Sequence, residues 1–255
     1  MITLSQANCE GWVPSATDIN GGVGNYGSCC HEVDVWEGNS VSTAFTVHPC
    51  TAGVQSSRCT GTACDGGLTG TCDPEGCDFN PYRMGNKTYY GPGKLVDSSS
   101  KLTVVTQFFT NNNSTTGLLS EIRRLYIQNG KVIQNSKVNI PGMAAYDSIT
   151  SAYCTAQEKV LLDRGFDQRG GLNATTKAMV YGMVLAMSVW EDHTSSMLWL
   201  DSNYPIDGDP SKAGISRGDC SVTSGKPEDV ESSATTARVT FSNIKYGDIG
   251  STYTV

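Results

Sequence analysis

Short runs that alternate apolar and polar residues recur along this 255-residue chain. A period of two is typical of strands with one buried face. Residues 102–109 and 122–128 each predict such a strand. Asn129 and Gly130 favour a type I′ turn, which would join the second strand to residues 131–134 as a hairpin.

Three later segments also predict strands, namely 183–191 and 197–201 as a pair and 237–246 as a late strand with good alternation. Helix is scarce, and 155–163 and 173–181 are the two short candidates. Many strands with few helices predict an all-β, antiparallel β-sandwich with long loops.

The composition fits this fold class and argues against two classes of partner, nucleic acids and membranes. The 28 glycines and 9 prolines suit many turns, and the absence of a linker or a composition shift predicts one domain. The 18 basic and 25 acidic residues give a net charge of −7, which argues against a nucleic-acid partner. No run of 18 apolar residues occurs, so we expect no membrane partner.

Ten cysteines against three histidines favour disulfides over zinc sites and indicate an oxidising compartment. The stretch 50–91 should be a long, stapled loop region. Four glycosylation sequons agree with secretion, at Asn86, Asn112, Asn113 and Asn173. The first residues lack the features of a signal peptide, which leads us to expect a missing beginning.

Three carboxylates lie close together in one apparently buried strand, at Glu32, Asp34 and Glu37. Burying an unpartnered charge is unfavourable, so such a group is tolerated mainly where carboxylates perform chemistry. Glycosidases need one ionised and one protonated carboxyl group. The alternative is a solvated strand edge that carries scattered acids.

Strand geometry sets a condition on the catalytic interpretation. On a regular strand Glu32 and Asp34 share one face and Glu37 points the other way, about 16 Å from Glu32 along the backbone. A retaining glycosidase needs its two carboxyl groups roughly 5–5.5 Å apart. We therefore predict a bend or bulge between Asp34 and Glu37. Crowded acids would raise at least one pKa and keep Glu37 protonated.

The run CCHEVDVWE at 29–37 resembles the signature of glycoside hydrolase family 7, the fungal and protist cellobiohydrolases and endoglucanases. The likeness continues in order through 46–50, 70–78, 80–83, 90–93, 102–108, 197–202 and 241–245. The resemblance implies a concanavalin-like β-sandwich and hydrolysis of β-1,4-glucosidic bonds with retention, without a metal or other cofactor. It implies Glu32 as nucleophile, Asp34 as its partner, Glu37 as acid/base and His48 close behind.

The same resemblance implies the sugar contacts. Trp190 and Trp199 would be stacking platforms on the leaving-group side, although core aromatics are the plainer interpretation. Trp12 and Trp36 are expected to pack inside. The remaining contacts would be Thr46, Glu75, Arg83, Tyr204 and Arg217, the last four in the product region.

Loop length bears on the mode of attack. By the resemblance, Tyr204 and Arg217 match positions where cellobiohydrolases bind the departing cellobiose, which favours a reducing-end cellobiohydrolase. Against this, the loop from Cys64 to Cys72 is shorter than in the most enclosed cellobiohydrolases and would permit more internal attack, so we expect a relatively open tunnel. An endoglucanase is the alternative within the family. A non-catalytic, lectin-like glucan-binding protein is the alternative from another class, and it would have no need for Glu37. In each case we expect a monomer that binds a β-1,4-glucan such as cellulose.

The family pattern also implies disulfide pairs, Cys50–Cys72, Cys59–Cys64 and Cys77–Cys154. It implies further that Cys29, Cys30 and Cys220 pair with cysteines upstream of residue 1, whereas Cys9 matches nothing in the pattern. We accordingly expect 1–255 to be the C-terminal portion of a single catalytic domain that lacks its N-terminal strands, and expect low activity from this portion alone.

Overall fold

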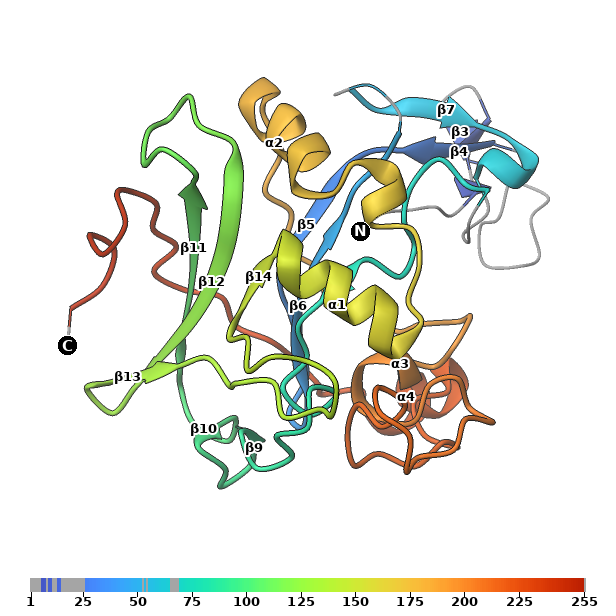
Figure 1. Cartoon of the computed structure of the whole chain (residues 1–255). Helices are drawn as coiled ribbons and strands as arrows, with labels where there is room; N and C mark the ends of the chain where they lie inside the picture. Colours follow the sequence, from blue (N-terminus) through green and yellow to red (C-terminus); the bar gives the residue numbers. More distant parts are fainter. Residues whose placement is uncertain are drawn as a thin grey trace.

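The computed structural model describes residues 6–7, 9–10, 13–14, 26–51, 53, 55–64 and 69–254. Two antiparallel sheets contain the longest strands of the structure (Figure 1). The first contains β11 (Thr103–Thr110), β12 (Leu119–Gln128), β13 (Lys131–Gln134) and β14 (Ser148–Thr150), with β14 paired to β12. The second contains β5 (Glu32–Gly38), β6 (Thr43–His48) and β8 (Cys77–Asp78), in the order β5-β6-β8.

Smaller elements surround these sheets. The short strands are β1 (Gln6–Ala7), β2 (Cys9–Glu10), β3 (Val13–Pro14), β4 (Tyr26–Cys29), β7 (Ser57–Cys59), β9 (Tyr90–Gly91) and β10 (Val96–Asp97). The helices are α1 (Ser151–Leu161), α2 (Gly171–Tyr181), α3 (Leu198–Asp201) and α4 (Pro227–Ser233), with single 3₁₀ turns at Gly61–Ala63 and Asp167–Arg169. The predominance of antiparallel strands agrees with the predicted class.

The predicted hairpin is confirmed. Strands β12 and β13 pair in register, with Gln128 opposite Lys131. Asn129 and Gly130 have φ angles of 52° and 69°, as a type I′ turn requires of both central residues. Asparagine and glycine are the residues that tolerate this left-handed conformation, so this local sequence was sufficient to set the turn.

Both predicted helices are confirmed, and the first begins earlier than expected. The hydroxyl of Thr150 accepts a hydrogen bond from the Tyr153 backbone N–H and so caps the N-terminus of α1. The helix ends at Leu161, and the following C-cap residue Leu162 adopts a left-handed conformation with φ 66°. Its inner face buries Tyr153, Cys154 and Gln157 against the sheets.

The main core lies between the two sheets and the helices α1 and α2. Phe79 stacks on Phe45 of β6 at 5.6 Å between ring centroids and on Tyr153 of α1 at 5.2 Å. The buried members of this core are Phe45, Val47, Cys77, Phe79, Met84, Leu119, Ile122, Val138, Ile140, Ile149, Tyr153, Cys154, Phe166 and Leu172. The catalytic-strand candidate β5 is thus carried at the edge of a sheet whose neighbour β6 is anchored in this core.

The three expected disulfides are confirmed, at Cys50–Cys72, Cys59–Cys64 and Cys77–Cys154. The last one ties β8 to α1 across the main core. Cys29, Cys30 and Cys220 carry no disulfide within the described part of the chain. The side chain of Cys9, and Trp12, lie outside the described residues.

Three predicted strands are wrong. Residues 183–191 and 237–246 form no regular element, and Leu198–Asp201 forms the short helix α3 instead. Val184 and Tyr246 are 94% and 99% exposed. Alternating apolar residues form a strand only when a neighbouring strand accepts their hydrogen bonds, and no described strand pairs with these segments. In Figure 1 the C-terminal segment is drawn as an irregular trace without a strand arrow.

Among the described residues, none of the helices has both the length and the apolar surface needed to cross a bilayer.

Candidate active site

A β-bulge interrupts β5 between two of the candidate acids. Asp34 lies opposite Thr46 on β6, whereas Glu37 lies opposite Ala44. Three steps along β5 therefore correspond to two steps along β6, so Val35 and Trp36 together face Phe45. An extra residue of this kind changes the side to which the following side chains point.

The bulge brings all three acids onto one face. Glu32 lies opposite His48, so the three acids match alternate positions of β6. Directly opposed residues of antiparallel strands point to the same side, and alternate residues share a face. The outer acids are thereby separated by four strand steps, roughly 13 Å of backbone, instead of five. The bulge thus directs Glu32 and Glu37 to the same face of β5, as a catalytic pair of carboxyl groups requires.

Asp34 and His48 form an ion pair within this face. Oδ2 of Asp34 lies 3.1 Å from Nε2 of His48, and Nδ1 of His48 donates a 2.8 Å hydrogen bond to the Asp73 backbone carbonyl. Burial alone would lower the pKa of His48, but the hydrogen bond and charge of Asp34 outweigh it and raise this pKa to about 9. Both ring nitrogens act as donors, so the imidazole is held as a cation.

Space behind His48 is closed by Gly76. With φ at +67°, a Cβ at Gly76 would stand 2.7 Å from the His48 ring. A side chain there would displace the imidazole from Asp34, so the site requires glycine at this position.

Glu37 carries the environment of an acid that holds its proton near neutral pH. Thr46 donates a 2.8 Å hydrogen bond to its Oε2. Burial and the charge of Asp34 raise the pKa of Glu37 to about 7, against the opposing effects of His48 and Thr46. Glu32 is buried at the start of the same strand, with 8% of its surface exposed.

A buried charge network supports the strand behind the acids. Asp78 of β8 lies opposite Thr46 and forms an ion pair with Arg83. Arg83 also contacts Asp163 at 2.8 Å and donates to the Gly214 carbonyl at 3.1 Å. Its guanidinium is thus satisfied by protein groups, which keeps β8 fixed beneath the site.

Sequence reasoning missed two residues that hold the bulge. The Val35 carbonyl accepts hydrogen bonds from the side chains of Arg124 and Thr106, which reach it from the other sheet. Arg124 is fully buried, and its guanidinium carbon lies 4.8 Å from the ring centroid of Phe45. The available signal was an arginine on the same strand face as Ile122 and Tyr126, which are both buried.

The two predicted tryptophan platforms lie against each other. Trp190 and Trp199 stack with centroids 6.2 Å apart and planes inclined by 23°. Nε1 of Trp199 donates a 3.0 Å hydrogen bond to Asp192, and Trp190 remains 38% exposed. Trp36, expected to pack inside, is only half-buried and packs edge-on against Phe241.

The expected product-side residues gather around Arg217. Its guanidinium lies 5.5 Å from the ring centroid of Tyr204, and its Nη1 donates a 3.4 Å hydrogen bond to the Trp199 carbonyl. Burial and the neighbouring Arg83 lower the pKa of Arg217 to about 10. Burial raises the pKa of Glu75, whose Oε2 accepts a hydrogen bond from the Arg164 backbone.

One large cleft connects these groups. It measures about 3030 Å³, several times the size of a small-molecule pocket, and is open enough for a polymer. Every predicted catalytic and sugar-contact residue lines it: Glu32, Asp34, Glu37, Thr46, His48, Glu75, Arg83, Trp190, Trp199, Tyr204 and Arg217. These residues span 186 positions of the sequence and therefore come together on one surface only in the folded chain.

Comparison with known proteins agrees with this geometry. The family model described as "Glycosyl hydrolase family 7" matches residues 3–253, and the chain belongs to that family. A crystal structure of a family 7 cellobiohydrolase from Daphnia pulex is 48% identical over 89% of this chain, with a TM-score of 0.82. This likeness confirms the β-sandwich class.

Two further structures show the range of the family. A cellobiohydrolase from Melanocarpus albomyces complexed with cellotetraose is 43% identical over 89% of this chain, with a TM-score of 0.76. The endocellulase EGI of Humicola insolens is 34% identical over 84%, with a TM-score of 0.70. The chain covers 52%, 51% and 50% of these three proteins, so it spans about half their length.

Proposed function

We propose that this chain carries the catalytic centre of a cellulase that hydrolyses β-1,4-glucosidic bonds with retention of configuration. The observation that carries the proposal is the bulge in β5, which turns three carboxylates onto one face of a polymer-sized cleft. Membership of glycosyl hydrolase family 7 supports the same reaction class.

In the first step Glu37 gives its proton to the glycosidic oxygen while the carboxylate of Glu32 attacks the anomeric carbon. The glycosidic bond breaks, the portion on the reducing-end side leaves as an alcohol, and the rest of the chain forms a glycosyl ester on Glu32. A pKa of about 7 lets Glu37 keep its proton in mildly acidic surroundings.

In the second step the ionised Glu37 takes a proton from a water molecule while the oxygen of that water attacks the same carbon. The ester bond breaks and Glu32 is released as a carboxylate. The Asp34–His48 pair lies next to Glu32 on the same face of the strand, where Asp34 would hold a proton or hydrogen bond that tunes the nucleophile. Two inversions at one carbon give net retention.

The sharpest test traps the ester. A 2-deoxy-2-fluoro-cellobioside with a good leaving group should label the protein once, and peptide mapping should place the label on Glu32. Glu32→Gln should not be labelled. Glu121→Gln is the matched control, because Glu121 is an acid on β12 that pairs with Arg123 away from the cleft. Labelling of another carboxylate, or an α-configured first product by NMR, would contradict the proposal.

Within the family we propose a reducing-end cellobiohydrolase with a relatively open tunnel. The higher identity to the Daphnia pulex and Melanocarpus albomyces cellobiohydrolases supports this, as does the arrangement of Arg217 and Tyr204 around the tryptophans. The substrate is then a cellulose chain and the main product cellobiose. The amount of soluble cellobiose released should exceed the number of new reducing ends formed on the remaining polymer.

An endoglucanase is the alternative, supported by the likeness to the Humicola insolens endocellulase and by the short loop between Cys64 and Cys72. Rapid loss of viscosity of a soluble cellulose derivative would favour it. A non-catalytic glucan-binding protein would bind cellotetraose with no 2-fluoro label at all. The three disulfides support a secreted location, and we further propose that the protein works as a monomer.

A further inference from the structure

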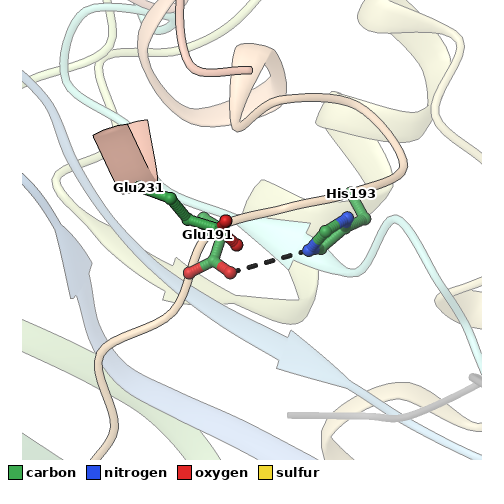
Figure 2. Close-up of side chains that lie close together, drawn as sticks. All are labelled: Glu191, His193 and Glu231. Atoms are coloured by element: carbon green, nitrogen blue, oxygen red, sulfur yellow. Dashed lines mark ion pairs between the residues drawn. The ribbon is translucent and has the colours of Figure 1, made fainter. Parts of the chain in front are cut away.

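A second cluster of ionisable side chains lies beyond the tryptophans. Glu191 and His193 come from the segment that follows Trp190, and Glu231 comes from helix α4. One ligand-type atom from each of the three lies within 4.8 Å of the other two. Figure 2 shows the two carboxylates and the imidazole grouped together across the gap between the two segments.

The backbone holds Glu191 and His193 in place. The carboxylate of Asp192, between them, accepts hydrogen bonds from the backbone of Thr194 at 2.8 Å and of Ser195 at 3.1 Å. It also accepts the Trp199 indole N–H at 3.0 Å. The buried residue thus fixes a turn that projects the residues on either side of it outward.

Helix α4 is held against the same turn. A Cβ at Gly225, just before the helix, would stand 2.1 Å from the Ser196 carbonyl oxygen. Only a glycine permits this approach of the two backbones. The position of Glu231 relative to His193 is therefore set by packing of the main chain.

The spacing suits a bound metal ion better than a direct contact. Oε1 of Glu191 lies 3.6 Å from Nε2 of His193, which is too long for a hydrogen bond. Two ligands of a tetrahedral ion with bonds of about 2.1 Å stand roughly 3.4 Å apart. The 3.6 Å between the Glu191 oxygen and the His193 nitrogen is close to this ligand–ligand distance.

Charge points the same way. Two carboxylates converge on one imidazole, and among the described residues neither Glu191 nor Glu231 forms an ion pair with a lysine or arginine. A divalent cation between them would compensate both charges. Imidazole as a ligand favours zinc-like transition metals over calcium, which takes six to eight oxygen ligands.

We propose that Glu191, His193 and Glu231 form a binding site for a divalent transition metal ion of the Zn²⁺ type, with water completing the coordination. The site has no part in the proposed hydrolysis. It would join the 191–193 turn to α4 and so steady Trp190, which stacks on Trp199 at the cleft.

The test uses the whole chain after treatment with a chelator. Calorimetric titration with Zn²⁺ should show one saturable site, weakened roughly 100-fold in Glu231→Gln and in His193→Gln. Glu228→Gln is the matched control, because Glu228 is exposed on the same helix outside the cluster and should bind as the wild type does.

Free cysteines could also bind zinc, so the ligands must be identified directly. Co²⁺ bound by nitrogen and oxygen should give weak visible bands without the intense near-ultraviolet thiolate band. In the wild type it should also broaden the NMR signal of His193 before those of the two other histidines. Thiolate absorption, broadening elsewhere first, or equal affinity in all variants would overturn the proposal, as would no saturable binding at millimolar Zn²⁺.

Discussion

Thr46 donates a 2.8 Å hydrogen bond to Glu37, although in the strand register Thr46 lies opposite Asp34. The contact exists because the bulge returns Glu37 to the face that Asp34 already occupies. One hydroxyl on β6 thus connects the irregular strand to the regular one. It also acts on the chemistry, since a hydrogen bond to the charged form of a carboxyl group lowers its pKa.

We therefore predict that Thr46→Val moves the alkaline limb of the kcat/KM profile to higher pH. Activity needs protonated Glu37, so the rate falls as pH rises through about 7, and loss of the Thr46 bond raises that value. Thr46→Ser keeps the hydroxyl and should leave the limb in place. A limb that moves to lower pH, or moves equally in both variants, would refute this role of Thr46.

Asp34→Asn should lower the pKa of His48. The Asp34 carboxylate supplies both the hydrogen bond and the charge that raise this pKa to about 9. NMR titration can follow the effect, because the chain has three histidines and His48→Gln would assign the signal. An unchanged His48 titration in Asp34→Asn would show that the 3.1 Å contact does not govern its charge.

The free energy of unfolding should fall with rising pH in two windows. Glu37 has a pKa raised from 4.5 to about 7 in the folded state, so between these values the folded state binds more protons than the unfolded state. Its contribution is complete below pH 4.5 and is lost as pH rises through about 7. His48, raised from 6.5 to about 9, acts likewise between those values.

Denaturant unfolding at a series of pH values checks this linkage. Glu37→Gln should flatten the lower window and His48→Gln the upper one. A slope that Glu37→Gln or His48→Gln leaves unchanged in its window would mean that the substituted group does not carry the expected shift.

Trp190→Ala should weaken cellobiose binding. If the exposed indole is a stacking platform, its loss removes about 1 kcal/mol of aromatic contact, roughly a fivefold rise in Kd. Trp190→Phe should fall between, and quenching of tryptophan fluorescence by cellobiose measures all three proteins. Unchanged affinity in Trp190→Ala would instead favour a purely structural Trp190–Trp199 stack.

Removing Cys77–Cys154 should destabilise the fold more than removing Cys59–Cys64. The first bridge closes 77 residues and the second closes 5, so chain entropy predicts losses of about 4 and about 2 kcal/mol. The double alanine variants of each pair allow the comparison by denaturant midpoint. Equal losses would mean that packing of the cysteines outweighs loop closure.

Local sequence predicted those elements whose structure depends on near neighbours. The Asn129-Gly130 turn follows from two residues that tolerate positive φ, and α1 and α2 follow from short helical patterns. The same reasoning failed at 183–191 and 237–246, because a strand depends on a distant partner that local alternation cannot supply. Leu198–Asp201 likewise finds no strand partner among the described residues and forms a short helical turn instead.

For the site, the sequence by itself determined which carboxylates stand close together and that a regular strand would misdirect Glu37. Only the tertiary structure decided how that conflict is resolved. Arg124 and Thr106 reach from the other sheet to the Val35 carbonyl, and β6 supplies the register that defines the bulge. These contacts join residues up to 89 positions apart. Their formation depends on packing between sheets, which no local pattern of residues encodes.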